Sequence, residues 1–220
     1  MTLKRFTDRA EAGRVLAGLL APYTKTKTVV YALPRGGVVV GVEVARALEV
    51  PLDLVITRKI GHPENPEYAI ASVSESGEVL CNPREPSPIS ESWFDEEVER
   101  QKQEAARRRQ AYLGDRARIS AKGKNAIIVD DGVATGLSLL IAIKEIKRDV
   151  PWKTVVAVPV VPADVAEEIK KEADELLAPI IDDHYLGAVG AYYDSFEQVT
   201  DDEVAAILKE FVPPSQKTQP

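Results

Sequence analysis

One stretch of the chain, residues 125–138, restricts its fold and its chemistry more than any other. After Asn125 it runs through the apolar residues Ala-Ile-Ile-Val, continues into the acidic pair Asp130 and Asp131, and then turns through small residues. A near-continuous apolar run is typical of a buried parallel strand, and in open α/β sheets ligands collect beyond the carboxyl ends of such strands. We therefore expect the acidic pair to lie at a ligand-binding edge of a parallel sheet.

The turn after the acidic pair has the composition of an anion-binding loop. Gly132 and Gly136 let backbone N–H groups close on an anion, and the hydroxyls of Thr135 and Ser138 add donors at the start of a helix expected over residues 139–147. Two carboxylates can meanwhile accept hydrogen bonds from neighbouring sugar hydroxyls. The order of these groups predicts a site for a phosphorylated sugar, and the alternative is a strand that ends in a solvated Asp-Asp turn.

At these residues the chain resembles the type I phosphoribosyltransferases, whose signature is four apolar residues, two acidic residues, a small or hydroxylated turn and Thr-Gly. The resemblance implies that Asp130 and Asp131 hold the 2′ and 3′ hydroxyls of phosphoribosyl pyrophosphate (PRPP). It also implies Mg²⁺ as cofactor, carried by PRPP, with the same two carboxylates as candidates for direct contact. The loop implied to hold the 5′-phosphate consists of Gly132, Val133, Ala134, Thr135, Gly136 and Ser138.

Strands and helices alternate along the chain, which indicates an α/β fold. A buried strand at 28–33, a helix at 38–49 and a strand at 52–57 form a right-handed β–α–β unit. With the resemblance, we expect a type I phosphoribosyltransferase-like core: a central, mainly parallel sheet flanked by helices, with a hairpin and flexible loop. We expect one domain over 1–212, with a small C-terminal hood at about 183–200, followed by a loose tail at 213–220. The other expected elements are a loop at 61–68, a hairpin at 69–82, strands at 154–161 and 176–181, and helices at 7–23, 90–113, 163–172 and 203–211.

A second glycine turn, Pro34-Arg35-Gly36-Gly37, follows the first core strand, so it should face the same edge of the sheet as the acidic pair. Arg35 offers a planar fork to diphosphate oxygens, and the glycines let the backbone approach them. The resemblance implies that this loop binds pyrophosphate and places a non-proline cis peptide around Pro34 to Gly36. The alternative is a plain β-turn.

Basic and acidic residues near the hairpin are further candidates. Arg58 and Lys59 end the second strand, where the resemblance implies an Arg-Lys pair whose charge stabilises the departing diphosphate. A solvated basic pair is the alternative. Glu67 is a candidate general acid or base, against a simple loop charge, and His62 is better explained as a surface histidine. The catalytic candidates are therefore Arg35, Lys59 and Glu67.

The acceptor is less constrained. Hypoxanthine–guanine enzymes typically carry an aspartate where this chain has Ala134, which argues against a 6-oxopurine. Tyr192, Tyr193 and Phe196 lie in the expected hood, where they either stack a base or form the hood core. Together with Pro-Arg-Gly-Gly, Arg-Lys-Ile-Gly and Ala-Val-Gly-Ala-Tyr-Tyr, these residues resemble a little-characterised group of predicted phosphoribosyltransferases without a settled acceptor.

Composition excludes several other classes. The 220 residues carry a net charge of −7, which disfavours nucleic-acid binding. One cysteine, Cys81, with His62 and His184, supports neither a disulfide framework nor a familiar zinc site, and no apolar run approaches a membrane span. We expect a cytoplasmic enzyme that transfers phosphoribosyl from PRPP to a nitrogenous acceptor and, by family habit, forms a homodimer. A PRPP-sensing regulator without turnover and a hydrolase of a phosphoribosyl compound are the alternatives.

Overall fold

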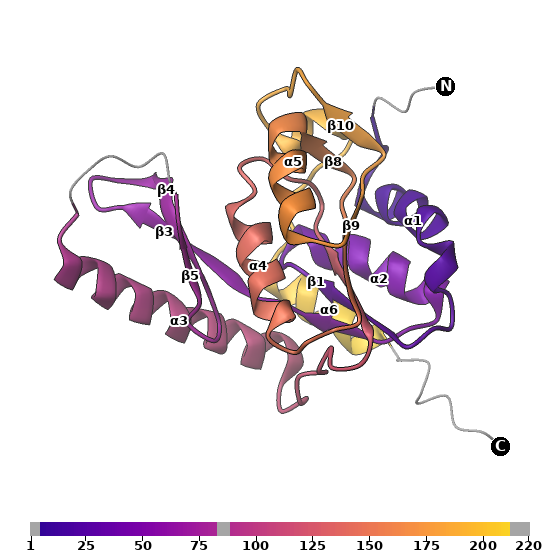
Figure 1. Ribbon diagram of the computed structural model, residues 1–220, viewed down its shortest axis with the longest axis horizontal. Helices are drawn as coiled ribbons and strands as arrows, with labels where there is room; N and C mark the ends of the chain where they lie inside the picture. Colours follow the sequence, from indigo (N-terminus) through magenta and orange to yellow (C-terminus); the bar gives the residue numbers. More distant parts are fainter. Residues whose placement is uncertain (1–4, 83–88, 212–220) are drawn as a thin grey trace.

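The computed structural model describes residues 5–82 and 89–211, which build a five-stranded parallel sheet (Figure 1). Its strand order is β2-β1-β6-β7-β9. Registered pairs run from Thr28 opposite Asn125 to Ala32 opposite Val129, so β1 and β6 end at the same height. The loops that follow these two central strands therefore leave the sheet side by side. The strands are β1 (Thr28–Ala32), β2 (Leu52–Leu54), β6 (Asn125–Val129), β7 (Lys153–Ala157) and β9 (Glu175–Leu177).

Helices cover both faces of this sheet, and the alternation of side chains along each strand explains why. In β1, Val30 and Ala32 pack into the core under one group of helices, whereas Val29 and Tyr31 pack into the core under the other. This arrangement confirms the predicted α/β architecture. The first group comprises α1 (Arg9–Leu19), α2 (Gly36–Leu48), α6 (Asp201–Glu210) and the C-terminal part of α3 (Glu91–Leu113), and the second comprises α4 (Leu137–Lys147) and α5 (Ala163–Glu172).

A three-stranded antiparallel sheet, β3 (Thr57–His62), β4 (Asn65–Ser74) and β5 (Val79–Cys81), extends from the body along α3 (Figure 1). The hairpin predicted around residues 75–77 is confirmed, but the loop predicted over 61–68 is wrong. His62 pairs with Asn65, and register shifts on either side of Gly61 absorb the turn-forming residues. Because Gly61 has no side chain, the Pro66 carbonyl can approach it; an added Cβ would lie 2.1 Å from that oxygen.

The predicted strands at 154–161 and 176–181 are each divided in two. Their second halves, β8 (Val160–Pro162) and β10 (Ile180–Asp182), pair in parallel as a separate two-stranded sheet. Pro159 and Pro179 mark the breaks, because proline cannot donate a ladder hydrogen bond. The second sheet and the short 3₁₀ helix η2 (Val189–Tyr192) carry the hood, whose core includes Phe6 from the other end of the chain.

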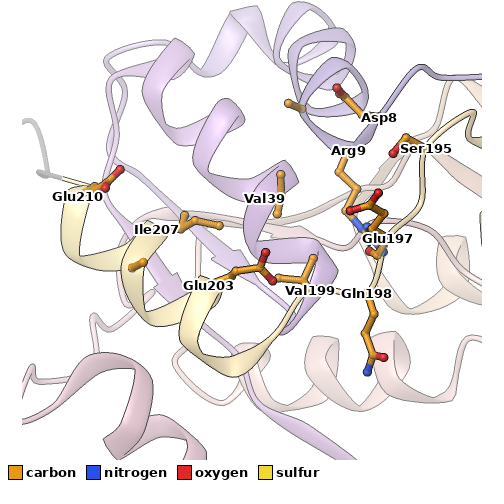
Figure 2. A pocket seen from close by; sticks show the side chains of 12 residues that line it. Asp8, Arg9, Val39, Ser195, Glu197, Gln198, Val199, Glu203, Ile207 and Glu210 are labelled. Atoms are coloured by element: carbon orange, nitrogen blue, oxygen red, sulfur yellow. Dashed lines mark hydrogen bonds between the residues drawn. The ribbon is translucent and has the colours of Figure 1, made fainter.

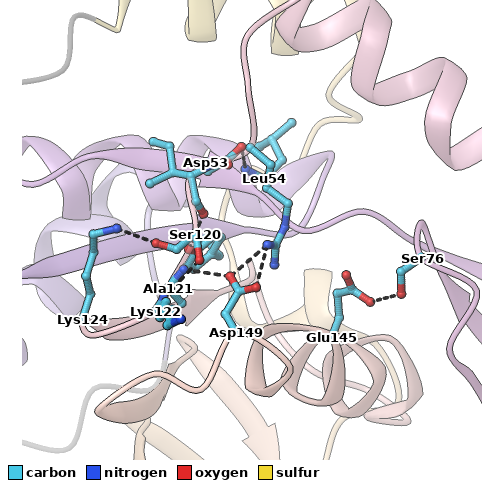
Figure 3. Close-up of polar contacts among 12 residues, drawn as sticks. Asp53, Leu54, Ser76, Ser120, Ala121, Lys122, Lys124, Glu145 and Asp149 are labelled. Carbon is cyan, nitrogen blue, oxygen red and sulfur yellow. Dashed lines mark hydrogen bonds and ion pairs between the residues drawn. The ribbon is translucent and has the colours of Figure 1, made fainter.

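A polar network secures the connection between α3 and β6 (Figure 3). Asp53, 1% exposed, accepts hydrogen bonds from the Ile119 amide at 2.6 Å and from Arg109 at 3.1 Å. Asp149 accepts from the Ala121 amide at 2.8 Å.

On α4, the buried Glu145 accepts from the hydroxyls of Ser74 and Ser76, which fastens the tip of the β4–β5 hairpin to the body. These contacts hold β3 and its basic residues at a fixed place beside the main sheet.

Side chains cap the first turns of two helices. Asp8 caps α1 by accepting from the Glu11 amide, and Thr200 with Glu203 forms a capping box at the start of α6. A 3₁₀ helix, η1 (Ala21–Tyr23), replaces the predicted last turn of the first helix. No helix within 5–82 or 89–211 is long and apolar enough to cross a bilayer. The predicted tail at 213–220 lies outside the described residues.

Candidate active site

The acidic pair lies directly against the glycine turn that follows β1. Asp130 and Asp131 come immediately after β6, and the Asp130 Oδ1 atom accepts the Asp131 amide at 2.8 Å. A Cβ on Gly37 would lie 2.9 Å from that Oδ1 atom, and a Cβ on Gly36 would lie 1.8 Å from the Asp131 Oδ2 atom. The two loops that the sequence predicts at one edge of the sheet are therefore in contact, and the glycines are what permits the contact.

The surroundings of the pair change its electrostatics. Burial raises the pKa of Asp130 well above its ordinary range, and the adjacent charge of Asp131 raises it further. The positive charge of Lys59 opposes this increase. Two adjacent carboxyl groups beside a lysine are therefore the arrangement of titratable groups at the end of β6.

A small cavity of about 160 Å³ opens beside Asp130, between the turn after β6 and the strand β3. Gly132 and Gly136 adopt positive φ angles of 151° and 78°, which lets the turn curve around this space. The amide of Val133 donates to the Val160 carbonyl at 2.9 Å, so this one amide is used internally. Within the described residues, the amides of Ala134, Thr135 and Gly136 have no protein acceptor. The cavity is lined by Lys59, Asp130, Gly132, Val133, Ala134, Thr135, Gly136, Ser138, Leu139 and Val189.

Arg58 and Lys59 separate onto opposite faces of β3, as neighbouring residues in a strand must. Lys59 lines the cavity, whereas the Nε atom of Arg58 donates to Gln101 of α3 at 3.0 Å. Burial lowers the pKa of Arg58, and the charge of Arg108 adds to this effect. The structure thus brings Lys59 to the site but not Arg58, which the sequence had grouped with it.

Arg35 begins α2 at the glycine turn. The peptide bond between Pro34 and Arg35 is cis, which confirms the expectation drawn from the resemblance. The Nη1 atom of Arg35 lies 3.6 Å from the Asp201 Oδ1 atom, which also accepts the Tyr112 hydroxyl at 2.7 Å. Arg35 therefore lies at the glycine turn but does not line the small cavity. Glu67 lies in β4, and its side chain falls outside what the structure describes.

The hood aromatics are mainly core residues. Tyr192 and Tyr193 are each 2% exposed, which favours the hood-core interpretation over base stacking. The Tyr193 hydroxyl donates to the Asp131 carbonyl at 2.6 Å, so the hood also supports the acidic pair. A second cavity, of about 320 Å³, meets the first at Ala134 and Thr135 and is lined in part by Tyr185. The buried Tyr185 hydroxyl has no hydrogen-bond partner in the described part of the chain, and burial raises its pKa to about 12.

Arg9 is a site residue that the sequence analysis missed. Its Nε atom donates to the Asp131 Oδ2 atom at 2.7 Å from the first turn of α1. It also lines a cavity of about 480 Å³ between α1, α2 and α6 (Figure 2). The sequence shows Arg9 only as a polar residue of an amphipathic helix, and no local signal distinguishes it from Arg14. The Tyr193 contact is equally a product of the tertiary fold.

Known proteins resemble this chain in sequence. The profile of the "Phosphoribosyl transferase domain" family matches residues 4–195. A Mycobacterium tuberculosis H37Rv protein, provisionally named phosphoribosyl transferase Rv0571c, is 38% identical over 208 residues, covering 94% of this chain and 47% of its own length. The counterpart from strain CDC 1551, MT0597, gives the same values. The chain thus spans about half the length of these curated relatives.

A solved structure is also similar to this chain, in both fold and sequence. The crystal structure of TT1426 from Thermus thermophilus is similar with a TM-score of 0.78 and 43% identity. The similarity covers 94% of this chain and 98% of that one. With the family profile spanning most of its length and a site built at the predicted sheet edge, the chain belongs to the phosphoribosyl transferase domain family.

Proposed function

We propose that the protein transfers the ribose 5-phosphate group of PRPP to a nitrogen nucleophile and releases pyrophosphate. The main support is the meeting of the acidic pair with the Gly36–Gly37 turn, beside a cavity that Lys59 and the loop after β6 enclose. Sugar-hydroxyl acceptors, a phosphate-sized loop and a backbone turn for diphosphate are thereby adjacent. Family membership supports a transferase, and the acceptor is left open.

Each group has a role in this scheme. Asp130 and Asp131 accept the 2′ and 3′ hydroxyls, and the amides of residues 134–136 with Thr135 and Ser138 receive the 5′-phosphate. The bond from the anomeric carbon to the pyrophosphate oxygen breaks as the carbon–nitrogen bond forms on the opposite face. Pyrophosphate leaves with the bonding electron pair, stabilised by Lys59 and Arg35. The proton of the nucleophile passes to a base, for which Glu67 is our candidate.

The donor set suits Mg²⁺, which prefers oxygen ligands and commonly binds through one or two carboxylates plus substrate phosphates. Asp130 and Asp131 offer such oxygens, although one oxygen of each is already held, by the Asp131 amide and by Arg9. No set of three or more His, Cys, Asp or Glu side chains among the described residues could hold a metal alone. This pattern favours a cation carried by PRPP. When bound, Mg²⁺ would neutralise charge on the departing pyrophosphate.

The alternative is a PRPP-sensing protein without turnover, which would need a partner surface. The arginines of α3 are poor candidates for one, because Arg107 and Arg108 pair with Glu104, and Arg109 is held by Asp53 and Glu75. Membership of a transferase family is what favours the enzyme over the sensor. A hydrolase would differ in needing no acceptor.

A screen of purine, pyrimidine and other nitrogen acceptors for pyrophosphate release from PRPP and Mg²⁺ tests this proposal. Release that depends on an acceptor supports a transferase, release without one supports a hydrolase, and binding without release supports a sensor.

The assignment of the acidic pair has its own test. The double variant Asp130→Asn, Asp131→Asn should lose PRPP binding while keeping the fold, because each change is nearly isosteric but weakens the acceptor. Undiminished calorimetric affinity of that variant for PRPP would refute the roles of both side chains. Size-exclusion chromatography with light scattering tests the expected homodimer.

A further inference from the structure

Arg9 reaches the ribose-binding pair from a distant part of the chain. Its Nε atom lies 2.7 Å from the Asp131 Oδ2 atom, and the two side chains are only 11% and 16% exposed. The start of α1 is fixed by the Asp8 cap, so the first turn of the helix presents Arg9 at a defined position. A charge-assisted contact in such a shielded place is stronger than an ion pair on an open surface.

The guanidinium of Arg9 is also held on its other sides. Its Nη1 atom donates to the Glu197 carbonyl at 2.7 Å, and its carbon lies 3.7 Å from the centre of the Phe196 ring. Figure 2 shows Arg9 extending from α1 toward the segment that carries Glu197. Since the Tyr193 hydroxyl holds the Asp131 carbonyl, both the side chain and the backbone of Asp131 are fixed. Asp131 therefore has little freedom to choose another orientation.

The contact between Arg9 and Asp131 also compensates charge. Asp130 and Asp131 are adjacent in the chain, and the proposed substrate is a multiply charged anion, which two unpaired carboxylates would repel. Arg9 offsets one of these charges without contacting the loop expected to hold the 5′-phosphate. The Asp131 carboxylate can then still accept a sugar hydroxyl, since an ionised carboxylate has about four acceptor positions.

We propose that Arg9 is a positioning residue for the sugar, which orients Asp131 and offsets its charge so that the ribose hydroxyls can be bound. This inference rests on the proposed function. It assigns Arg9 no contact with the reacting atoms and no role at the pyrophosphate turn. The effect of removing it should therefore fall more heavily on binding of the sugar than on binding of inorganic pyrophosphate, which would feel only the uncompensated charge of Asp131.

Arg5 provides a matched control. Its Nη2 atom donates to the Tyr193 carbonyl at 3.1 Å, and its Nε atom lies 3.6 Å from Asp194. Like Arg9, it ties the start of the chain to the hood segment, but it does not contact Asp131. A purely structural role of Arg9 in that attachment would make the two arginines similar in their effects.

The experiment measures, by calorimetry with Mg²⁺, the affinities of the full chain for PRPP, ribose 5-phosphate and pyrophosphate. We expect R9Q to weaken the binding of PRPP and ribose 5-phosphate by roughly 10-fold to 150-fold, the value of one charged hydrogen bond lost between Asp131 and a ribose hydroxyl. Pyrophosphate affinity should fall by a much smaller factor, R5Q should leave all three affinities within about twofold, and R9K should recover part of the loss.

The outcomes separate the two proposals. A wild-type protein without affinity for PRPP refutes the proposed function. A wild-type protein that binds PRPP, with R9Q unchanged or with R9Q weakened equally toward pyrophosphate, refutes the role of Arg9 alone. If R9Q does not fold, R9K decides: selective weakening toward ribose 5-phosphate supports the proposal, and unchanged affinity overturns it.

Discussion

Substitution of Gly36 by alanine should damage sugar binding more than it damages the fold. An added Cβ would lie 1.8 Å from the Asp131 Oδ2 atom, 2.6 Å from its Cγ atom and 2.7 Å from the Arg9 Nε atom. All three atoms belong to side chains, and Gly36 is in helical conformation at the start of α2, so the backbone can accept alanine. The side chains must therefore move, and they are the ones proposed to hold the ribose.

The size of this effect follows from the geometry. Ordinary contact begins at 3.4 Å, so the Asp131 carboxylate must retreat by the difference from 1.8 Å, about 1.6 Å. A movement of that size breaks its 2.7 Å hydrogen bond to Arg9 and redirects the acceptor. The redirected carboxylate would lose its charged hydrogen bond to a ribose hydroxyl, and such a bond contributes about 1.5–3 kcal/mol, which corresponds to roughly a 10-fold to 150-fold loss of PRPP affinity.

Calorimetric titration with PRPP and urea denaturation measure the two effects separately. Gly18→Ala is the matched control, because Gly18 is an exposed position of α1 with nothing within 4 Å of an added Cβ. It should leave PRPP affinity unchanged and stabilise the protein by about 0.5–1 kcal/mol. Gly37→Ala should instead lower stability, since its Cβ would meet the backbone atoms Asp130 Cα at 3.0 Å and Val129 O at 3.1 Å. Wild-type PRPP affinity in Gly36→Ala would refute this reasoning.

Two further predictions concern stability. Asp53→Ala removes a buried carboxylate from Arg109 and from the Ile119 amide, so urea denaturation should show a loss of about 3 kcal/mol, and a loss below about 1 kcal/mol would contradict the role given to this network. Hydrogen bonds from Arg107, then Arg108, lower the pKa of Glu104 from 4.5 to about 2, so its contribution is complete above about pH 4.5 and is lost as the pH falls toward 2. Because Glu104 is partly exposed, Glu104→Gln should lower the free energy of unfolding by only about 0.5–1 kcal/mol at pH 7, and by progressively less from pH 4.5 down to pH 3. A loss of stability that does not change with pH would contradict the role given to these ion pairs.

Much of the fold and part of the site could be read from local patterns. The apolar run before Asp130 and the glycine turn at Arg35 predicted two neighbouring loops at one sheet edge, and both lie there. Pro159 and Pro179 interrupt the predicted strands 154–161 and 176–181, and each proline could have indicated that the strand divides there. The loop expected at 61–68 failed because a glycine bulge can keep turn-forming residues inside a hairpin.

The missed site residues depend on contacts across the whole chain. Arg9 and Asp131 are 122 positions apart, and Tyr193 reaches Asp131 from 62 positions away. No periodicity of α1 indicates which of its arginines will meet a carboxylate on another element. Likewise, strand alternation separates Arg58 from Lys59, but packing decides which face of β3 turns toward α3 and therefore which of the two residues reaches the site.

The acidic pair is held in place by the first helix and by the hood segment, and this has a consequence for biosynthesis. During translation the N-terminal part emerges and folds first, so β1, α2, β2 and β6 can assemble while the hood segment is still in the ribosome. At that stage Asp131 lacks the hydroxyl of Tyr193, and Arg9 lacks the Phe196 ring and the Glu197 carbonyl that hold it. A nascent chain should therefore pair these core strands before Asp131 acquires the contacts that fix its orientation.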